Sequence, residues 1–86
     1  MIDAYEAYNK TKYKKEIMAV QSAIDTNVFN AIESGNYFCY YEFEEHTPTY
    51  IRREIEEWLE LLGYDFRYGK PVSNPNKMEI RWMHKE

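Results

Sequence analysis

The chain has little of several things that small proteins use for stability or chemistry: among its 86 residues are one cysteine, two histidines, three glycines and three prolines. A single cysteine, Cys39, excludes an intramolecular disulfide, and neither histidine is close enough to it in the sequence for a local zinc motif. No apolar run approaches the roughly 18 residues of a membrane span or the core of a signal peptide. We therefore expect no metal, no cofactor, no membrane insertion and no secretion, and a reducing, cytoplasmic location.

The same scarcity argues against catalysis. Gly35, Gly63 and Gly69 each stand where a helix stop or a turn is expected, so no phosphate-cradling loop can be assembled. No serine lies in a glycine-flanked elbow. Cys39 falls on the core-facing side of its strand, which favours a structural thiol over a nucleophile. We expect no catalytic residue and no enzymatic activity.

Charge limits the partners. The formal net charge of −4 argues against general DNA or RNA binding, which relies on a basic surface. A basic run, Lys10 to Lys15, is either a solvated helix surface or an anion-binding patch. Acidic residues gather in the middle of the chain, at Glu42, Glu44, Glu45, Glu54, Glu56, Glu57 and Glu60. Arg52 and Glu56, and likewise Arg53 and Glu57, stand four residues apart on one exposed helix face, which predicts surface ion pairs.

The spacing of apolar residues predicts the elements. Residues 3–34 form a helix about 48 Å long at ~1.5 Å per residue, closed by Gly35. Its core stripe is Tyr13, Ile17, Val20, Ile24, Val28 and Ala31. Alternation over 36–44 predicts a strand. A second helix, with Thr47 as its cap and Pro48 as its first residue, ends near Leu62; its stripe is Ile51, Ile55, Trp58, Leu59 and Leu62. Alternation at 64–68 and 78–82 predicts a hairpin with a long loop.

The predicted fold class is α+β. Residues 1–86 form one domain, in which 1–35 are the long helix and 36–86 a β-α-β-β unit. If the third strand lies between the other two, the sheet is three-stranded and mainly antiparallel, and both helices cover one face of a two-layer sandwich. Trp58 and Trp82 are expected in the core.

Two surfaces are candidates for binding. A second apolar line runs along the back of the long helix through Ala4, Ala7, Tyr8, Met18 and Phe29. Because this helix outruns the sheet, the line predicts a homo-oligomer, most simply an antiparallel dimer, or docking on a partner helix; scattered apolar surface residues are the ordinary alternative.

The outer sheet face is the second candidate. It carries Phe38, Tyr40, Glu42, Arg67, Arg81 and Met83 if the inner face holds Tyr37, Phe66 and Trp82. Arginine pairs with anions and stacks on rings, so Tyr40, Arg67 and Arg81, with Lys70 in the hairpin loop, are the predicted ligand-binding residues. Solvated sheet faces also favour such residues.

Three segments carry a resemblance: Ala31-Ile32-Glu33-Ser34-Gly35-Asn36-Tyr37, then Leu59 to Leu62 with Gly63-Tyr64, and Ile80-Arg81-Trp82. Together with the long charged helix, they resemble small uncharacterised proteins encoded by tailed bacteriophages. The resemblance implies a role in the host cytoplasm: binding and disabling host factors, sequestering nucleotide signals of host defence, or serving as a minor part of replication or of the particle.

Two classes of function follow. The first is a binding protein that sequesters a small anionic ligand, such as a nucleotide signal in counter-defence. The second is a protein-interaction module that inhibits or recruits a macromolecule, with its acidic patch steering it to a basic partner.

Overall fold

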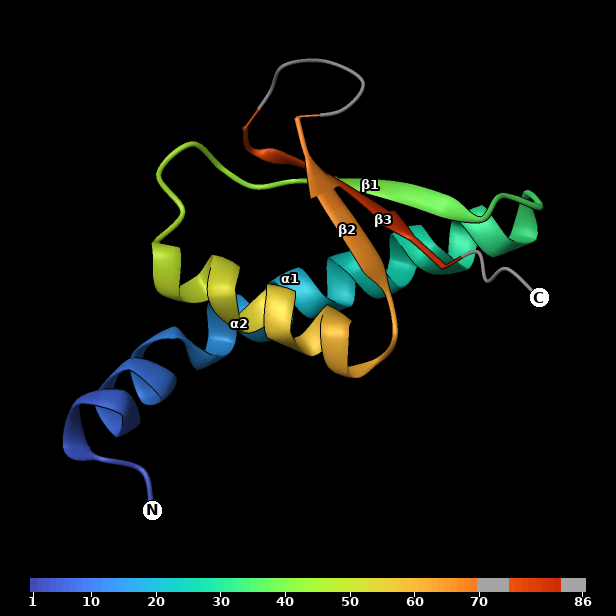
Figure 1. The fold of residues 1–86 in the computed structure, drawn as a ribbon. Helices are drawn as coiled ribbons and strands as arrows, with labels where there is room; N and C mark the ends of the chain where they lie inside the picture. The colour runs from blue at the N-terminus through green and yellow to red at the C-terminus, as the bar shows by residue number, and fades with distance from the viewer. Residues whose placement is uncertain (70–74, 83–86) are drawn as a thin grey trace.

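The computed structural model describes residues 1–69 and 75–82 and shows an α+β two-layer sandwich (Figure 1). The elements run α1 (Ala4–Glu33), β1 (Phe38–Glu42), α2 (Thr49–Leu61), β2 (Asp65–Tyr68) and β3 (Lys77–Arg81). The strands form one antiparallel sheet in the order β1-β3-β2. The predicted fold class is confirmed, and the strand order, which the sequence left open, places the third strand at the centre.

The helices form the second layer. In Figure 1 both lie on the same side of the sheet, with α1 packed against β1 and α2, and α2 packed against β2. The first turns of α1 extend beyond the rest of the molecule. Within the described residues, neither helix has the apolar stretch that crossing a membrane requires.

Both helices end where their glycines predict. At the start of α1, the Asp3 carboxylate accepts a hydrogen bond from the backbone N–H of Glu6 at 2.8 Å. At its end, Gly35 adopts a φ of 75°, and its N–H donates to the Ile32 carbonyl at 3.0 Å. Gly63, with a φ of 88°, ends α2 in the same way. A left-handed glycine after each helix returns the chain toward the sheet.

The start of α2 differs from the prediction by one residue. The Thr47 hydroxyl donates to the Glu44 carbonyl at 2.8 Å and so stabilises the turn after β1, where it cannot cap the helix. Pro48 is the N-cap residue, with no side-chain cap, and its carbonyl accepts from the Ile51 N–H at 3.1 Å. The helix therefore begins at Thr49, and the predicted roles of Thr47 and Pro48 are wrong.

The core lies between the helices and the inner sheet face. Each layer contributes side chains that are at most 8% exposed: Ile24, Val28, Ala31, Cys39, Phe43, Ile51, Ile55, Leu59, Met78 and Ile80. Trp58 and Trp82 are only half-buried and pack at the edge of this cluster. Leu62, predicted to be in the core, is 57% exposed, because it is the C-cap residue and lies beyond the last turn of α2.

Strand alternation places the side chains on the two sheet faces as predicted, with one exception. Cys39, Phe66 and Ile80 are paired across the three strands and face the helices. Tyr37, predicted on the inner face, is 61% exposed because it precedes β1 and has no helix over it.

Arg52 connects α2 to the sheet. Its guanidinium carbon lies 5.0 Å from the ring centroid of Phe43 and 5.8 Å from that of Tyr68. It also donates to the Pro75 carbonyl at 3.2 Å. Glu56, the expected surface partner of Arg52, instead accepts a hydrogen bond from the Tyr68 hydroxyl. The expected Arg52–Glu56 surface pair is therefore replaced by contacts that tie α2 to the sheet.

Candidate functional site

The predicted ligand-binding residues of the sheet do share one face. Tyr40 on β1 and Arg67 on β2 are both paired with Glu79 on β3, and Arg81 follows Glu79 by two residues on the same face. Lys70 lies outside the described residues. The structure thus brings three of the four predicted residues onto one surface, with a carboxylate at its centre.

That carboxylate already engages the groups expected to hold an anion. The Tyr40 hydroxyl donates to Glu79 Oε2 at 3.3 Å, and Arg81 Nε lies 3.9 Å from Glu79 Oε1. Burial and the Glu79 charge raise the pKa of Tyr40. Lys77 adds a cation 4.8 Å from the Tyr40 ring centroid. An incoming anion would have to displace Glu79 from both partners.

One hollow adjoins this surface. It measures about 270 Å³ and lies between the turn after α1 and the end of the sheet, where Phe38 and Arg81 flank the backbone of 35–37. An aromatic ring next to a guanidinium suits a flat anion. Tyr40 and Arg67 do not line it.

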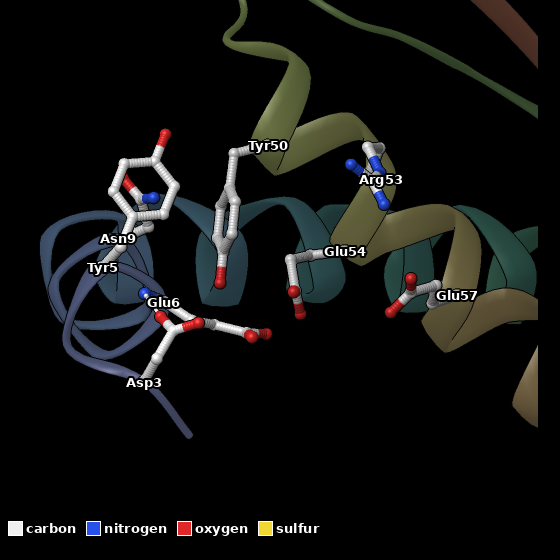
Figure 2. A pocket seen from close by; sticks show the side chains of 8 residues that line it. All are labelled: Asp3, Tyr5, Glu6, Asn9, Tyr50, Arg53, Glu54 and Glu57. Carbon is white, nitrogen blue, oxygen red and sulfur yellow. Dashed lines mark hydrogen bonds between the residues drawn. The ribbon is translucent and has the colours of Figure 1, made fainter. Parts of the chain in front are cut away.

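A second cleft is lined by more ionisable side chains. It measures about 240 Å³ and lies between the first turns of α1 and the first half of α2 (Figure 2). We call it the acid–tyrosine cleft; its lining residues are Asp3, Tyr5, Glu6, Asn9, Tyr50, Arg53, Glu54 and Glu57. Four carboxylates against one guanidinium give this lining a formal charge of −3.

Local sequence explains which side chains line it. On α2, Tyr50, Arg53, Glu54 and Glu57 recur at spacings of three and four, so they share one helix face. Part of that face lies next to α1, because α2 packs against α1. The sequence predicted these acids only as an exposed, ion-paired surface.

Tyr50 is the central side chain of the cleft. Its ring stacks on Tyr13 with centroids 5.7 Å apart, and in Figure 2 its hydroxyl points toward Glu6 and Glu54. The hydroxyl oxygen is buried and makes no hydrogen bond of ordinary geometry with the described residues. Burial raises the pKa of Tyr50, and so do the charge of Glu54, a hydrogen-bonding interaction with Glu54 that lies outside ordinary geometry, and the charges of Glu6 and Glu57. A neutral hydroxyl, whose oxygen can accept a hydrogen bond from a cation, therefore lies among carboxylates.

The carboxylates of the cleft already attract an ammonium group from the chain itself. Lys10 Nζ lies 3.7 Å from Glu54 Oε1 and 3.9 Å from Glu6 Oε1. The Lys10 side chain is 42% exposed, so this contact lies at the rim and is open to competition from solvent cations. The arrangement can hold a positive charge between α1 and α2.

A third depression is larger and has a mixed polar and apolar lining. It measures about 420 Å³ and lies between the middle of α1 and the segment that joins β1 to α2. Val20, Tyr41, Phe43 and Ile51 form its floor. It contains none of the predicted ligand-binding residues.

Neither metal nor thiol chemistry is indicated in the part of the chain that the structure describes. No group of three or more histidine, cysteine, aspartate or glutamate side chains there is arranged to hold a metal ion. Cys39 is 8% exposed, and burial raises the pKa of its thiol to about 11. Such a thiol is protonated and inert near neutral pH.

The apolar line predicted on the back of α1 is exposed. Ala4 and Ala7 lie at the surface, and Tyr8, Met18 and Phe29 are 61%, 56% and 60% exposed. None of these five residues belongs to the core. Their exposure leaves this face available for the predicted oligomer contact, which stays a prediction.

No protein-family model matches this chain, and none of the curated proteins or solved structures shows significant similarity to it.

Proposed function

We propose that this protein is a non-catalytic interaction module that binds a basic segment of a macromolecular partner, with a lysine or arginine side chain entering the acid–tyrosine cleft. The observation that carries the proposal is a cleft of formal charge −3 whose carboxylates surround the buried Tyr50 hydroxyl, which makes no hydrogen bond of ordinary geometry with the described residues. A cytoplasmic location belongs to the same proposal.

The chemistry of the lining supports a cation. Carboxylates accept charge-assisted hydrogen bonds from ammonium and guanidinium groups, and tyrosine rings favour a cation over their faces. Tyr5 and Tyr50 supply rings from α1 and α2, and the carboxylates of Glu6 and Glu54 lie near the Tyr50 hydroxyl (Figure 2). The contact of Lys10 with both carboxylates is an intramolecular example of the same recognition.

Electrostatics also favour this partner over an anion. The whole chain carries −4, so its field attracts basic partners and repels nucleotides. On the sheet, the Glu79 carboxylate already accepts a hydrogen bond from Tyr40 and pairs with Arg81. The anionic-ligand hypothesis keeps one supporting observation, the hollow between Phe38 and Arg81, and is the second candidate.

Peptide titration tests the proposal. Fluorescein-labelled hexalysine should bind, and hexaglutamate should not, in about 0.1 M salt, where the Debye length of about 10 Å suppresses long-range attraction. Glu54→Gln should weaken hexalysine binding about tenfold, because a hydrogen bond to a charged group contributes roughly 1.5 kcal/mol or more. Circular dichroism checks that each variant is folded.

Glu60→Gln is the matched control, since it removes the same charge from an exposed position on α2 outside the cleft. It should change affinity less than about twofold. Lys10→Gln should tighten binding, because it removes the internal competitor for Glu6 and Glu54. Equal weakening by the Glu54 and Glu60 variants would mean general attraction to an acidic surface, and the proposal would be wrong.

A further inference from the structure

The exposed face of α1 has a regular pattern. Nine residues spaced three or four apart run along the whole helix and face away from the core. We call them the outer stripe: Ala4, Ala7, Thr11, Lys14, Met18, Ser22, Asp25, Phe29 and Ile32. Every member is exposed, including Phe29 at 60% and Ile32 at 57%. Large apolar side chains in such a line are unusual on a monomer.

The outer stripe is symmetric about Met18. Ala4 and Ile32 are equally far from Met18 along the helix, and so are Ala7 and Phe29. If a second α1 lies antiparallel against the first, each bulky side chain of one half meets an alanine of the other. Alternation of large and small side chains at facing positions is what close helix packing requires.

The polar members of the stripe are matched in the same orientation. Thr11 and Asp25 are equally far from Met18, so the hydroxyl of one copy faces the carboxylate of the other. Lys14 lies within about one helical turn of that carboxylate across the contact. A parallel pair would instead place Lys14 against Lys14 and Asp25 against Asp25, which is repulsive.

We propose that the outer stripe of α1 pairs with the same stripe of a second copy of this chain, antiparallel, with the two-fold axis at Met18. Closed two-fold contacts are the commonest arrangement of soluble homo-oligomers. The inference does not depend on the proposed function, because the cleft residues Glu6 and Asn9 lie on other faces of α1.

Mass in solution is the first test. Light scattering at about 100 µM, where a dimer with a dissociation constant of 1–10 µM is mostly assembled, should give twice the 10.5 kDa of one chain. Met18→Glu and Phe29→Glu should each return the mass to that of one chain while the helical circular dichroism is kept. Asn30→Glu, an exposed position of α1 outside the stripe, should leave the dimer intact. A monomeric wild type would overturn the proposal.

Disulfide cross-linking tests the register, in a Cys39→Ala background. Met18→Cys should form a covalent dimer on mild oxidation, because the two copies of this position meet at the axis. Ala7→Cys alone should not, because its two copies are roughly 33 Å apart in the antiparallel pair at 1.5 Å per residue, far beyond disulfide reach. Cross-linking through Ala7→Cys, or none through Met18→Cys in a protein of dimeric mass, would overturn the antiparallel arrangement.

Discussion

Replacing Tyr50 by phenylalanine should stabilise the free protein and weaken its binding of a cation. The variant keeps the ring that stacks on Tyr13 and removes only the buried hydroxyl that lacks a partner. An unsatisfied buried polar group costs roughly 1–3 kcal/mol, and we take the lower end because Tyr50 as a whole is only half-buried. The expected gain is about 1 kcal/mol, equivalent to roughly 4–8 °C in Tm for a domain of this size.

Thermal and urea unfolding, followed by tryptophan fluorescence and circular dichroism, measure this gain. Tyr13→Phe is the matched control: it removes a hydroxyl from the other ring of the same stack and should change stability by less than about 0.5 kcal/mol. Hexalysine titration of Tyr50→Phe should show weaker binding than wild type. If Tyr50→Phe destabilises the fold by 1 kcal/mol or more, the hydroxyl is well partnered in the free protein, and the argument that it is available to a cation fails.

Three further predictions concern the fold. Leu59→Ala should lower the free energy of unfolding by about 3 kcal/mol in urea, because Leu59 is fully buried. Leu61→Ala on the same helix should be nearly neutral, because Leu61 is 87% exposed. Similar losses at both positions would contradict the core assignment. Arg52→Lys should cost about 1–2 kcal/mol through lost stacking and donation, and Arg53→Lys almost nothing, by the same assay. The Cys39 thiol should be unreactive toward thiol reagents at pH 8. Because its pKa is 9.0 in the unfolded chain and about 11 in the folded protein, its contribution to stability should be full below pH 9 and should fall as the pH rises toward 11. The urea midpoint of a Cys39→Ala variant should fall less over this range, and an equal fall would assign the effect to other groups.

Most of the fold follows from local signals in the sequence. Apolar spacing in 3–34 and 49–61 specifies two amphipathic helices, and Gly35 and Gly63 end them because only glycine adopts their positive φ without strain. Alternation specifies the strands, but their order was left open, because the central place of the third strand is a condition for burying both helices on one face and no local pattern requires it. The start of α2 was missed because a threonine before proline can also stabilise a turn, as Thr47 does with Glu44.

The sites were harder to predict. Alternation correctly placed Tyr40, Arg67 and Arg81 on one face, but the same alternation puts Glu79 among them, and its carboxylate competes with an anion for these groups. The acid–tyrosine cleft depends on where α1 crosses α2, and no local pattern specifies that crossing. The recurrence of tyrosine and glutamate along one face of 50–57 is the only hint that the sequence offers.

The most direct test of the central claim is an NMR titration of the uniformly ¹⁵N-labelled protein with unlabelled hexalysine. The account predicts that the largest amide shift changes cluster at residues 3–9 and 50–57, and that they diminish in Glu54→Gln but persist in Glu60→Gln. Changes centred instead on 38–42 and 77–81, or spread evenly over the acidic surface, would contradict it.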